Sequence, residues 1–391
     1  MLVPAGLLAL SLIFLLYSGL GYPALLALLS RFRRARRRAE GTGMAASPRV
    51  SITIPVYNEA AVIAGTLERI LEIDYPAERR QILVVSDAST DGTDEIVGRF
   101  AGRGVELVRL PERQGKTAAE NAARPYLTGE IIVNTDASIR IHPGALTRLV
   151  AAFADPTVGV ASGRDVSVAN LDDRSNPGEQ AYVGYEMWVR GLETQAFGIV
   201  GASGCLYAIR RDLHLRYVPE MTSRDFGAAL AARQQGYRAV SVGDAVCYVP
   251  RSGSLGREYR RKVRTVARGL RTLWLHRDLL DPVRYGRFAW MLWSHKVFRW
   301  LLPWVGLVAA VSVAALVPVE AWPRAAIGLG GAAVGAGLVA LVSRRSRRQF
   351  AALAYALLAN VAVIEAWLRF LVRSVPAVWE PTRRPGVGTA R

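Results

Sequence analysis

The N-terminal stretch constrains this chain most, because Leu2–Leu29 contains no charged side chain. An uncharged run of this length can cross a lipid bilayer as a helix, which needs about 20 residues. A cleaved signal peptide would carry its basic residues before a shorter apolar run, whereas here arginines follow the run, from Arg31 to Arg38. Because basic residues favour the cytoplasmic side, we expect residues 1–30 to form a signal anchor whose N-terminus lies outside.

Two further uncharged runs near the C-terminus predict a helical hairpin across the membrane. They are Trp300–Val319 and Ala325–Ser343, and the second ends in an arginine cluster. We therefore assign residues 300–343 to a transmembrane hairpin. Directly before it, residues 285–299 mix aromatic with basic side chains, which is typical of an interfacial helix at the headgroup level.

Residues 350–373 form a third apolar C-terminal segment, interrupted by Glu365 and Arg369. It could span the membrane or re-enter it. A re-entrant arrangement, which we favour slightly, keeps the basic tail 374–391 on the cytoplasmic side. The chain is thus expected to be a multi-pass protein of the cell (inner or plasma) membrane, with its central part in the cytoplasm.

The net charge of +18 is unevenly distributed along the 391 residues. Residues 1–49, which include a basic linker at 31–47, carry a net charge of +6, residues 50–250 carry −5, and residues 251–391 carry +17. Nucleic-acid binding needs a basic footprint on the folded domain, so we expect no nucleic acid as a partner. The positive charge lies beside the apolar segments, where it meets anionic membrane lipids.

Residues 48–284 read as one cytoplasmic α/β domain. Short β-branched runs alternate with helical patterns, which argues for a mostly parallel sheet flanked by helices. The helical patterns run over about Glu59–Glu72, from about Thr93, and across Thr117–Ala123. The expected strands are Val50–Ile54, Ile82–Val85, Val105–Val108 and Ile131–Val133.

The loops that follow the four expected strands are polar or acidic. They read P-V-Y-N-E at 55–59, S-D-A-S-T-D-G-T at 86–93, R-Q-G-K at 113–116 and N-T-D-A-S at 134–138. Ligands of such sheets bind at the carboxyl ends of the strands, so these loops are where chemistry is expected. The sequence contains no G-x-G-x-x-G and no P-loop motif, which disfavours dinucleotide-binding and P-loop readings.

Together these motifs resemble the family 2 inverting glycosyltransferases of GT-A fold, of the membrane-anchored bacterial type. The resemblance extends over roughly residues 48–384 and includes the segment 201–211, Arg224-Asp225-Phe226 and the tail motif W-E-P-T-R-R. It implies a nucleotide-sugar donor and Mg²⁺ or Mn²⁺. It also implies substrate-binding roles for Pro55, Tyr57 and Glu59 after the first strand.

The resemblance assigns donor-binding roles to two aspartates. Asp87 is implied to contact the nucleoside; the alternative is a helix N-cap or turn acceptor. Asp136 matches the first Asp of the family's D-x-D motif, which holds the metal on the diphosphate. The second position is Ser138 instead of Asp, which leaves the affinity and choice of metal open.

On the acceptor side, the resemblance implies that Asp225 is the general base. It takes the proton from the acceptor hydroxyl; the alternative is a helix N-cap. The family's usual acidic pair is single here because Arg224 precedes Asp225. Gly204, in the small-residue loop 201–204, is placed at the acceptor. Glu186 and Glu193 share one helix face, either on the acceptor side or as a solvated surface.

Three basic residues are further candidates for substrate binding. Arg261 and Arg264 stand where processive polysaccharide synthases carry Q-x-x-R-W, but this chain lacks both Gln and Trp. Arg264 is expected to clamp the diphosphate; the alternative is a basic stripe facing lipid. Lys116 is implied to lie near the nucleotide, or else to be a surface residue at a helix start.

The sequence therefore predicts a membrane-bound inverting glycosyltransferase, hexosyl or N-acetylhexosaminyl, that uses a donor such as a UDP-sugar. The acceptor is expected to be a lipid-linked or cell-surface glycan. One alternative is a processive polysaccharide synthase of the cellulose, hyaluronan or poly-N-acetylglucosamine type, in which the chain would supply part of a channel together with an unknown partner membrane protein. Another is a catalytically silent membrane scaffold that binds a nucleotide sugar.

Overall fold

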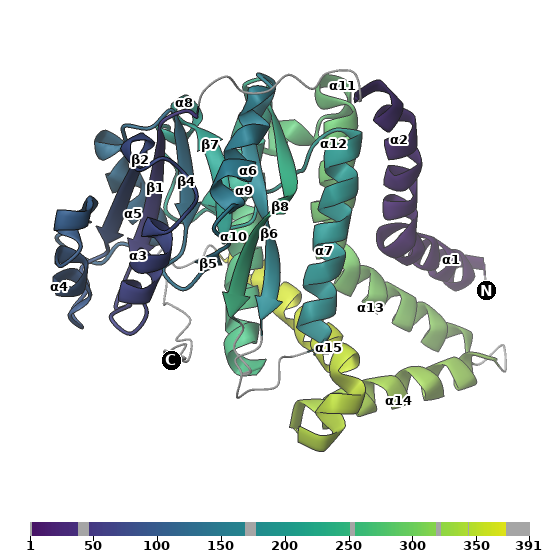
Figure 1. The fold of residues 1–391 in the computed structure, drawn as a ribbon. Coiled ribbons are helices and arrows are strands. Elements are labelled where there is room, and N and C mark those ends of the chain that lie inside the picture. Colours follow the sequence, from purple (N-terminus) through teal and green to yellow (C-terminus); the bar gives the residue numbers. More distant parts are fainter. Residues whose placement is uncertain are drawn as a thin grey trace.

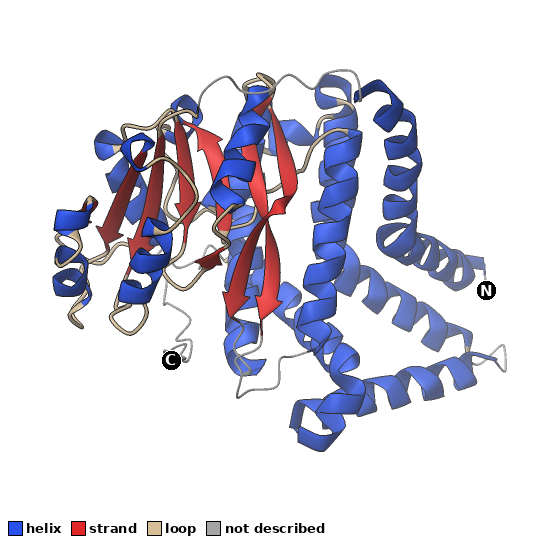
Figure 2. Ribbon diagram, in the orientation of Figure 1, coloured by secondary structure: helices blue, strands red, loops and turns tan. Residues whose placement is uncertain are grey.

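The computed structural model describes residues 2–37, 47–168, 177–250, 255–317, 322–342 and 344–372. Its centre is a sheet of eight strands in the order β3-β2-β1-β4-β7-β6-β8-β5 (Figure 1). Helices cover both faces of this sheet (Figure 2). The expected fold class is confirmed, with the qualification that the sheet is mixed rather than nearly all parallel.

The parallel half of the sheet is formed by the four strands that the sequence predicts. β1 (Val50–Val56) pairs in parallel with β2 (Arg80–Ser86) and with β4 (Ile131–Thr135), and β2 pairs in parallel with β3 (Val105–Arg109). All seven residues of β1 are buried, as expected for a central strand covered on both faces. The helices between these strands are α3 (Ile63–Leu71), α4 (Thr93–Gly98) and α5 (Lys116–Ala123).

The second half of the sheet contains strands that the sequence analysis did not identify. β7 (Leu206–Arg210) runs antiparallel between β4 and β6 (Val158–Val168), and β8 (Arg238–Pro250) lies beyond β6. The short β5 (Arg140–Ile141) closes the edge. The antiparallel β7 makes the sheet mixed, and its inward residues join the cores on both faces.

The remaining helices of the domain include residues for which the resemblance implies an acceptor role. They are α6 (Ala145–Ala151), α7 (Pro177–Ala196), α8 (Arg211–His214), α9 (Arg224–Gln234), α10 (Leu255–Leu275) and α11 (Pro282–Tyr285). The long helix α7 stands upright beside the sheet, between β6 and the N-terminal helices (Figure 1).

Two long helices combine a part that packs on the domain with an apolar part. The N-terminal one consists of α1 (Leu2–Leu16), a π-helical segment (Tyr17–Gly21) and α2 (Tyr22–Arg37). The other consists of α12 (Arg287–Leu292), a π-helical segment (Trp293–Val297) and α13 (Phe298–Leu316). The predicted interfacial helix and the predicted span after it are thus one continuous helical run. Tyr17 Oη lies 2.7 Å from Ser294 Oγ and accepts a hydrogen bond from Trp290.

Three helices of the described chain are long and apolar enough to cross a membrane. They are Leu2–Arg31, Arg287–Leu316 and Leu353–Leu371. The third belongs to α15 (Arg344–Leu371), which has a kink at Phe350. The run predicted as the second leg of the hairpin forms α14 (Trp322–Val342). The tail 374–391 and linker residues 38–46 lie outside the described residues.

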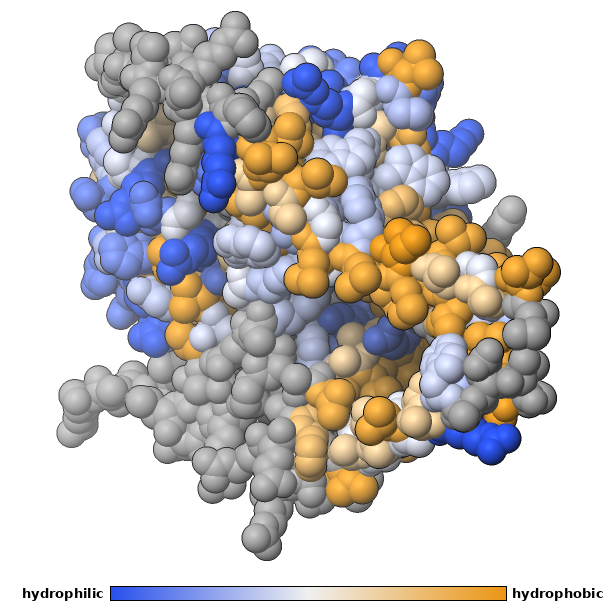
Figure 3. Space-filling view, turned by 90° about the vertical axis from the view of Figure 1, so that its right-hand side faces the viewer, coloured by the Kyte–Doolittle hydropathy of each residue, from blue (hydrophilic) through white to orange (hydrophobic). Residues whose placement is uncertain are grey.

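Exposed apolar side chains gather on the face that these helices present. Figure 3 shows them as a band across that face, with a hollow below the band in which hydrophilic side chains lie. Exposed apolar side chains of α1, α13 and α14 include Leu2, Ile13, Val311 and Leu329. An apolar surface of this extent is unusual for a protein surrounded by water.

Candidate active site

The loop before Lys116 is held by the carboxylate of Asp87. Asp87 is almost fully buried, and its two oxygens accept hydrogen bonds from the backbone N–H groups of Gln114 (2.7 Å) and Gly115 (2.8 Å). Gly115 has a φ of +99°, which favours glycine. Asp87 is therefore neither the cap nor the turn acceptor of its own loop. It fixes the next loop along the sheet edge, while its predicted nucleoside contact stays a prediction.

Lys116 and Asp136 form an ion pair above the ends of β3 and β4. Glu120 lies 4.0 Å from the Lys116 ammonium and also faces Arg224, at 3.9 Å. Although burial alone would lower it, these two carboxylates raise the pKa of Lys116 above its usual value. Burial raises the pKa of Glu120, against the pull of Lys116 and Arg224. Lys116 is therefore a fixed positive charge beside the predicted metal ligand.

Asp225 lies in the first turn of α9, with its carboxylate directly over Gly204. A Cβ atom at position 204 would lie 2.9 Å from Asp225 Oδ2, so the close approach of this loop requires glycine. Ser223 donates a hydrogen bond from its hydroxyl to Asp225 Oδ1. The carboxylate is thus oriented by a neighbour, and its second oxygen faces the loop 201–204.

Lys116, Asp136, Gly204 and Asp225 line one cavity of about 400 Å³. Six of the predicted substrate-binding or catalytic residues are brought together there: Lys116, Asp136, Gly204, Asp225, Arg261 and Arg264. The other predicted residues are not among its lining. Pro55 is buried in β1, and the ring of Tyr57 stacks under the Arg113 guanidinium at 3.8 Å. Glu59 follows in the same loop, and Ser138 is half-buried two residues after Asp136.

Arg261 and Arg264 reach the cavity from α10. Arg261 forms a bidentate ion pair with Glu258, in which both N–O distances are 2.8 Å. Arg264 lines the cavity one turn further along the helix. Arg268, another turn on, is buried and donates hydrogen bonds to Thr117 and to the carbonyl of Thr222. The basic face of α10 is thus turned toward the domain, and a wholly lipid-facing stripe is excluded.

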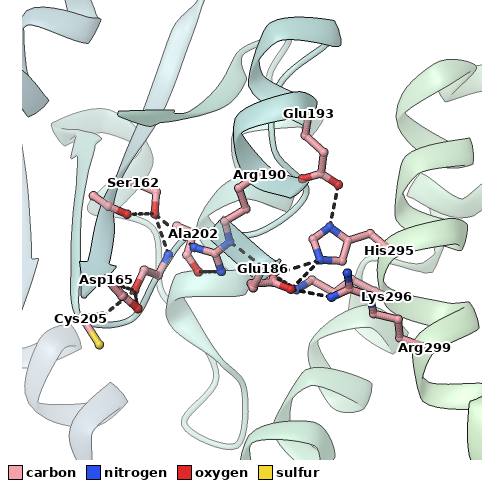
Figure 4. A network of polar contacts seen from close by, with 12 residues as sticks. Ser162, Asp165, Glu186, Arg190, Glu193, Ala202, Cys205, His295, Lys296 and Arg299 are labelled. Atoms are coloured by element: carbon pink, nitrogen blue, oxygen red, sulfur yellow. Dashed lines mark hydrogen bonds and ion pairs between the residues drawn. The ribbon is translucent and has the colours of Figure 1, made fainter. Parts of the chain in front are cut away.

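Glu186 and Glu193 of α7 belong to a buried charge cluster, shown in Figure 4. His295 lies between them, with Nδ1 2.6 Å from Glu193 and Nε2 3.0 Å from Glu186. Arg299 and Lys296 of the same helix also pair with Glu186, and Arg190 faces it from α7. Glu193 has no exposed surface and Glu186 only 8%, so the prediction of a solvated face is wrong.

The buried cluster brings basic side chains around Glu186. Both ring nitrogens of His295 face carboxylate oxygens, Nδ1 that of Glu193 and Nε2 that of Glu186. Arg190, Lys296 and Arg299 also lie beside Glu186. Although burial opposes it, His295, Arg299 and Lys296 hold the pKa of Glu186 well below its usual value.

Several cavity residues were missed by the sequence analysis. Asp165, on β6, lines the cavity and accepts a hydrogen bond from Ser203 at 2.7 Å. Lys296 and Trp300 enter from the helix that begins at Arg287, and Tyr355 enters from α15. The signal that could have found Lys296 and Trp300 is their place in an aromatic and basic stretch; nothing in the sequence singled out Asp165 or Tyr355.

The protein side chains at Asp136 can coordinate a divalent cation only together with oxygen ligands from a substrate. No group of three or more His, Cys, Asp or Glu side chains is arranged to hold a metal within the described ranges. Asp136 offers one carboxylate, and Ser138 follows two residues later. Mg²⁺ commonly binds through one or two carboxylates together with substrate phosphates and water. The residues therefore fit a metal that arrives with a diphosphate.

The sheet, its loop motifs and this cavity have the arrangement of the GT-A fold. Residues 51–217 match the family model described as glycosyl transferase family 2, the family that the loop motifs resemble. The mannosyltransferase PcManGT from Pyrobaculum calidifontis, solved with GDP-Man and Mn²⁺, has a TM-score of 0.65 and 28% identity. The match covers 93% of this chain and 99% of that one.

Curated relatives match over shorter stretches. The beta-monoglucosyldiacylglycerol synthase of Nostoc sp. is 28% identical over 196 residues, which cover 49% of this chain and 41% of the relative. An N-acetylglucosaminyltransferase of Mesorhizobium japonicum is 28% identical over 238 residues, covering 56% of this chain and 55% of the relative. The chain thus spans about two fifths to a little over half of these relatives' length.

Proposed function

We propose that this protein transfers a sugar, with inversion, from a nucleotide-sugar donor to an acceptor carried by a membrane lipid. The observation that carries the proposal is the lining of one cavity. It combines Asp225, the Lys116–Asp136 pair and three side chains from candidate membrane helices, Lys296, Trp300 and Tyr355. An acceptor hydroxyl that reaches Asp225 along those helices comes from the lipid side.

The donor diphosphate binds between Lys116, Asp136 and Arg264. Lys116 and Arg264 neutralise charge on the diphosphate, and Arg264 supplies paired N–H donors. Asp136, with Ser138, holds a divalent cation, Mg²⁺ or Mn²⁺, whose chemistry is to neutralise the charge that develops on the leaving diphosphate. Asp87 holds the loop before Lys116 in position through the backbone of Gln114 and Gly115. Asp87 also contacts the nucleoside, beside Pro55, Tyr57 and Glu59. A UDP-sugar is the donor we favour, and the solved relative bound to GDP-Man makes GDP-mannose the second choice.

Asp225 acts as the general base at the acceptor. Its carboxylate takes the proton of the acceptor hydroxyl while that oxygen forms a bond to the anomeric carbon. The bond from the anomeric carbon to the diphosphate breaks on the opposite side, and the electron pair leaves with the diphosphate. An in-line displacement of this kind inverts the anomeric centre, so an α-configured donor gives a β-linkage. Ser223 holds the carboxylate in place.

Membrane attachment supports a lipid acceptor. The three candidate spans and the exposed apolar band on one face fit a protein embedded through several passes. The arginines after Leu29 favour a cytoplasmic catalytic domain. The Nostoc relative is named for a glycolipid product, which fits an acceptor of this class.

Two alternatives remain distinguishable by experiment. A processive synthase would extend its product by many sugars, and the absence of Q-x-x-R-W at Arg261–Thr265 disfavours it. A silent scaffold would bind a nucleotide sugar without reaction, and the oriented carboxylate of Asp225 in the cavity argues against it.

The test measures release of nucleoside diphosphate by the full chain, purified in detergent, over a panel of nucleotide sugars. Membrane lipid extract and Mn²⁺ or Mg²⁺ are added, and Asp136→Ala and Asp225→Ala are run alongside. We expect release from one donor that needs lipid and metal and is lost in both variants. Donor binding without release under every condition would overturn the transferase in favour of the scaffold, and products of many lengths would favour the synthase.

A further inference from the structure

A second cavity, of about 280 Å³, lies apart from the catalytic one and shares no lining residue with it. Its walls come from the end of α9, the start of β8, the loop after α7 and the segment in which α11 leads into α12. Three arginines line it, each from a different element: Arg233, Arg238 and Arg287.

No carboxylate lines this cavity among the residues described. Two carboxylates that contact its lining residues are already engaged. Asp155 pairs with Arg238, and Asp278 accepts a hydrogen bond from the Tyr285 hydroxyl at 3.1 Å. Arg233 and Arg287 instead lie over aromatic rings, Phe288 at 5.6 Å and Phe197 at 5.0 Å. The cavity therefore has an excess of positive charge.

Two guanidinium N–H groups at this cavity lack acceptors. Arg233 Nε and Arg238 Nη1 are buried, and no acceptor for either is found in the described part of the chain. A buried donor without an acceptor is costly. The aromatic rings contact the guanidinium groups of Arg233 and Arg287 through cation–π interactions but supply no acceptor oxygen. The cavity is thus short of both negative charge and hydrogen-bond acceptors, and an oxyanion would provide both.

The position of the cavity indicates where such an anion would come from. Arg287 and Phe288 are the first residues of the helical run Arg287–Leu316, one of the candidate membrane spans. Arginine and aromatic side chains at the start of a span lie at the level of the lipid headgroups. Figure 1 shows α12 starting beside α11, at the end of the run farthest from α13.

We propose that this cavity binds the phosphodiester of an anionic phospholipid headgroup. Guanidinium groups bind phosphate oxygens through paired, charge-assisted hydrogen bonds, and basic pockets on the cytoplasmic side of membrane proteins hold such headgroups. A bound headgroup would supply the acceptor oxygens and the negative charge. It would fasten α12 to α9 and β8 at a site separate from catalysis.

The test uses the full chain in detergent and dioctanoyl phosphatidylglycerol as the probe, with dioctanoyl phosphatidylcholine and inorganic phosphate as separate arms. Native mass spectrometry counts bound lipid, and the thermal unfolding midpoint reports stabilisation. We expect phosphatidylglycerol to bind and to raise the midpoint, and the other two probes to do neither. Equal binding of phosphatidylcholine would overturn the proposal. Inorganic phosphate binding as tightly as phosphatidylglycerol would identify a soluble phosphate as the ligand and overturn the lipid source.

The variant Arg233→Gln/Arg287→Gln should weaken phosphatidylglycerol binding by about tenfold or more. The matched control is Arg284→Gln, which removes the same charge from an exposed neighbour outside the cavity lining and should bind as the parent does. Arg287→Lys, which keeps the charge but loses the paired donors, provides a milder variant should the double variant fail to fold. Unchanged binding in a folded double variant, or in Arg287→Lys where the double variant does not fold, would refute the assignment. The experiment needs no donor sugar, so its outcome is independent of the proposed transferase activity.

Discussion

His295 and Glu193 are joined by a hydrogen bond of 2.6 Å, although they lie 102 residues apart in the chain. Glu193 belongs to α7 of the catalytic domain, and His295 to the π-helical segment of the run that continues into a candidate membrane span. Tyr22 of the N-terminal helix donates a hydrogen bond to the same carboxylate. Three separate parts of the chain therefore meet at one buried carboxylate behind the cavity.

Removal of His295 should destabilise the protein strongly. His295→Leu removes one of the two side chains that contact the fully buried Glu193 carboxylate, and leaving a buried polar group without its partner costs about 1–3 kcal/mol, and more for a charged group. Thermal unfolding of the detergent-purified variant measures the loss as a lower midpoint. The double variant His295→Leu/Glu193→Leu removes both partners and should be more stable than His295→Leu alone. A single variant as stable as the parent would contradict the buried pair.

The cluster also predicts a dependence of stability on pH. The pKa of Glu186 is held well below its usual value of 4.5 by His295, Arg299 and Lys296, although burial alone would raise it. A carboxyl with a lowered pKa in the folded state contributes stability above its unfolded pKa, and this contribution disappears as pH falls through the folded value. Unfolding midpoints measured from about pH 6 down to pH 3 should therefore fall below pH 4.5. Glu186→Gln should show a shallower fall, and an identical slope would refute this.

Gly204→Ala should impair catalysis through Asp225. The added Cβ would meet Asp225 Oδ2 at 2.9 Å and push the carboxylate from its position. A displacement of about 1 Å at a reacting group can cost roughly 10²-fold in rate. We expect a fall in kcat of that order for sugar transfer, with donor affinity kept. Gly184→Ala, where a Cβ meets nothing within 4 Å, is the control, and equal kinetics in both variants would contradict the contact.

Asp87→Ala should loosen the loop that carries Lys116. The change leaves the N–H groups of Gln114 and Gly115 without their acceptor, and an unsatisfied buried donor costs about 1–3 kcal/mol. We expect a lower unfolding midpoint and a higher KM for the donor. Asp212→Asn, a change on α8 outside the cavity lining, serves as the comparison. A higher KM with unchanged stability would mean that Asp87 acts on the nucleotide alone.

The first half of the domain could be predicted from the sequence because its signals are local. The strands end in turn-forming and acidic residues, as at Asp87 and Asp136, and a helix follows each of the first three strands. The edge of a parallel sheet then brings separate loops together without knowledge of any long-range contact. The convergence of Lys116 and Asp136 is a consequence of that geometry.

The rest depended on contacts between distant segments. Nothing near Glu193 in the sequence indicates that its partner is His295, so an acceptor-side position and a solvated face stayed as the alternatives. Asp87 likewise has the same neighbours whether it caps its own helix or holds the loop at Gly115. The second half of the sheet was missed because β7 and β6 take their pairing from each other and from β4, which local patterns do not reveal.

The two π-helical segments contact each other through Tyr17 and Ser294. Each segment determines how the side chains before it are rotated about the helix axis relative to the side chains after it. A π-turn holds one residue more than an α-turn, and each residue of an α-helix advances the side-chain direction by about 100°. The stripe that α2 and α12 turn toward the domain is therefore out of register with the stripe on α1 and α13. One continuous helix can thereby present a surface that packs on the domain at one end and a lipid-compatible surface at the other. Deleting a single residue from either segment would rotate one of these surfaces away from its surroundings.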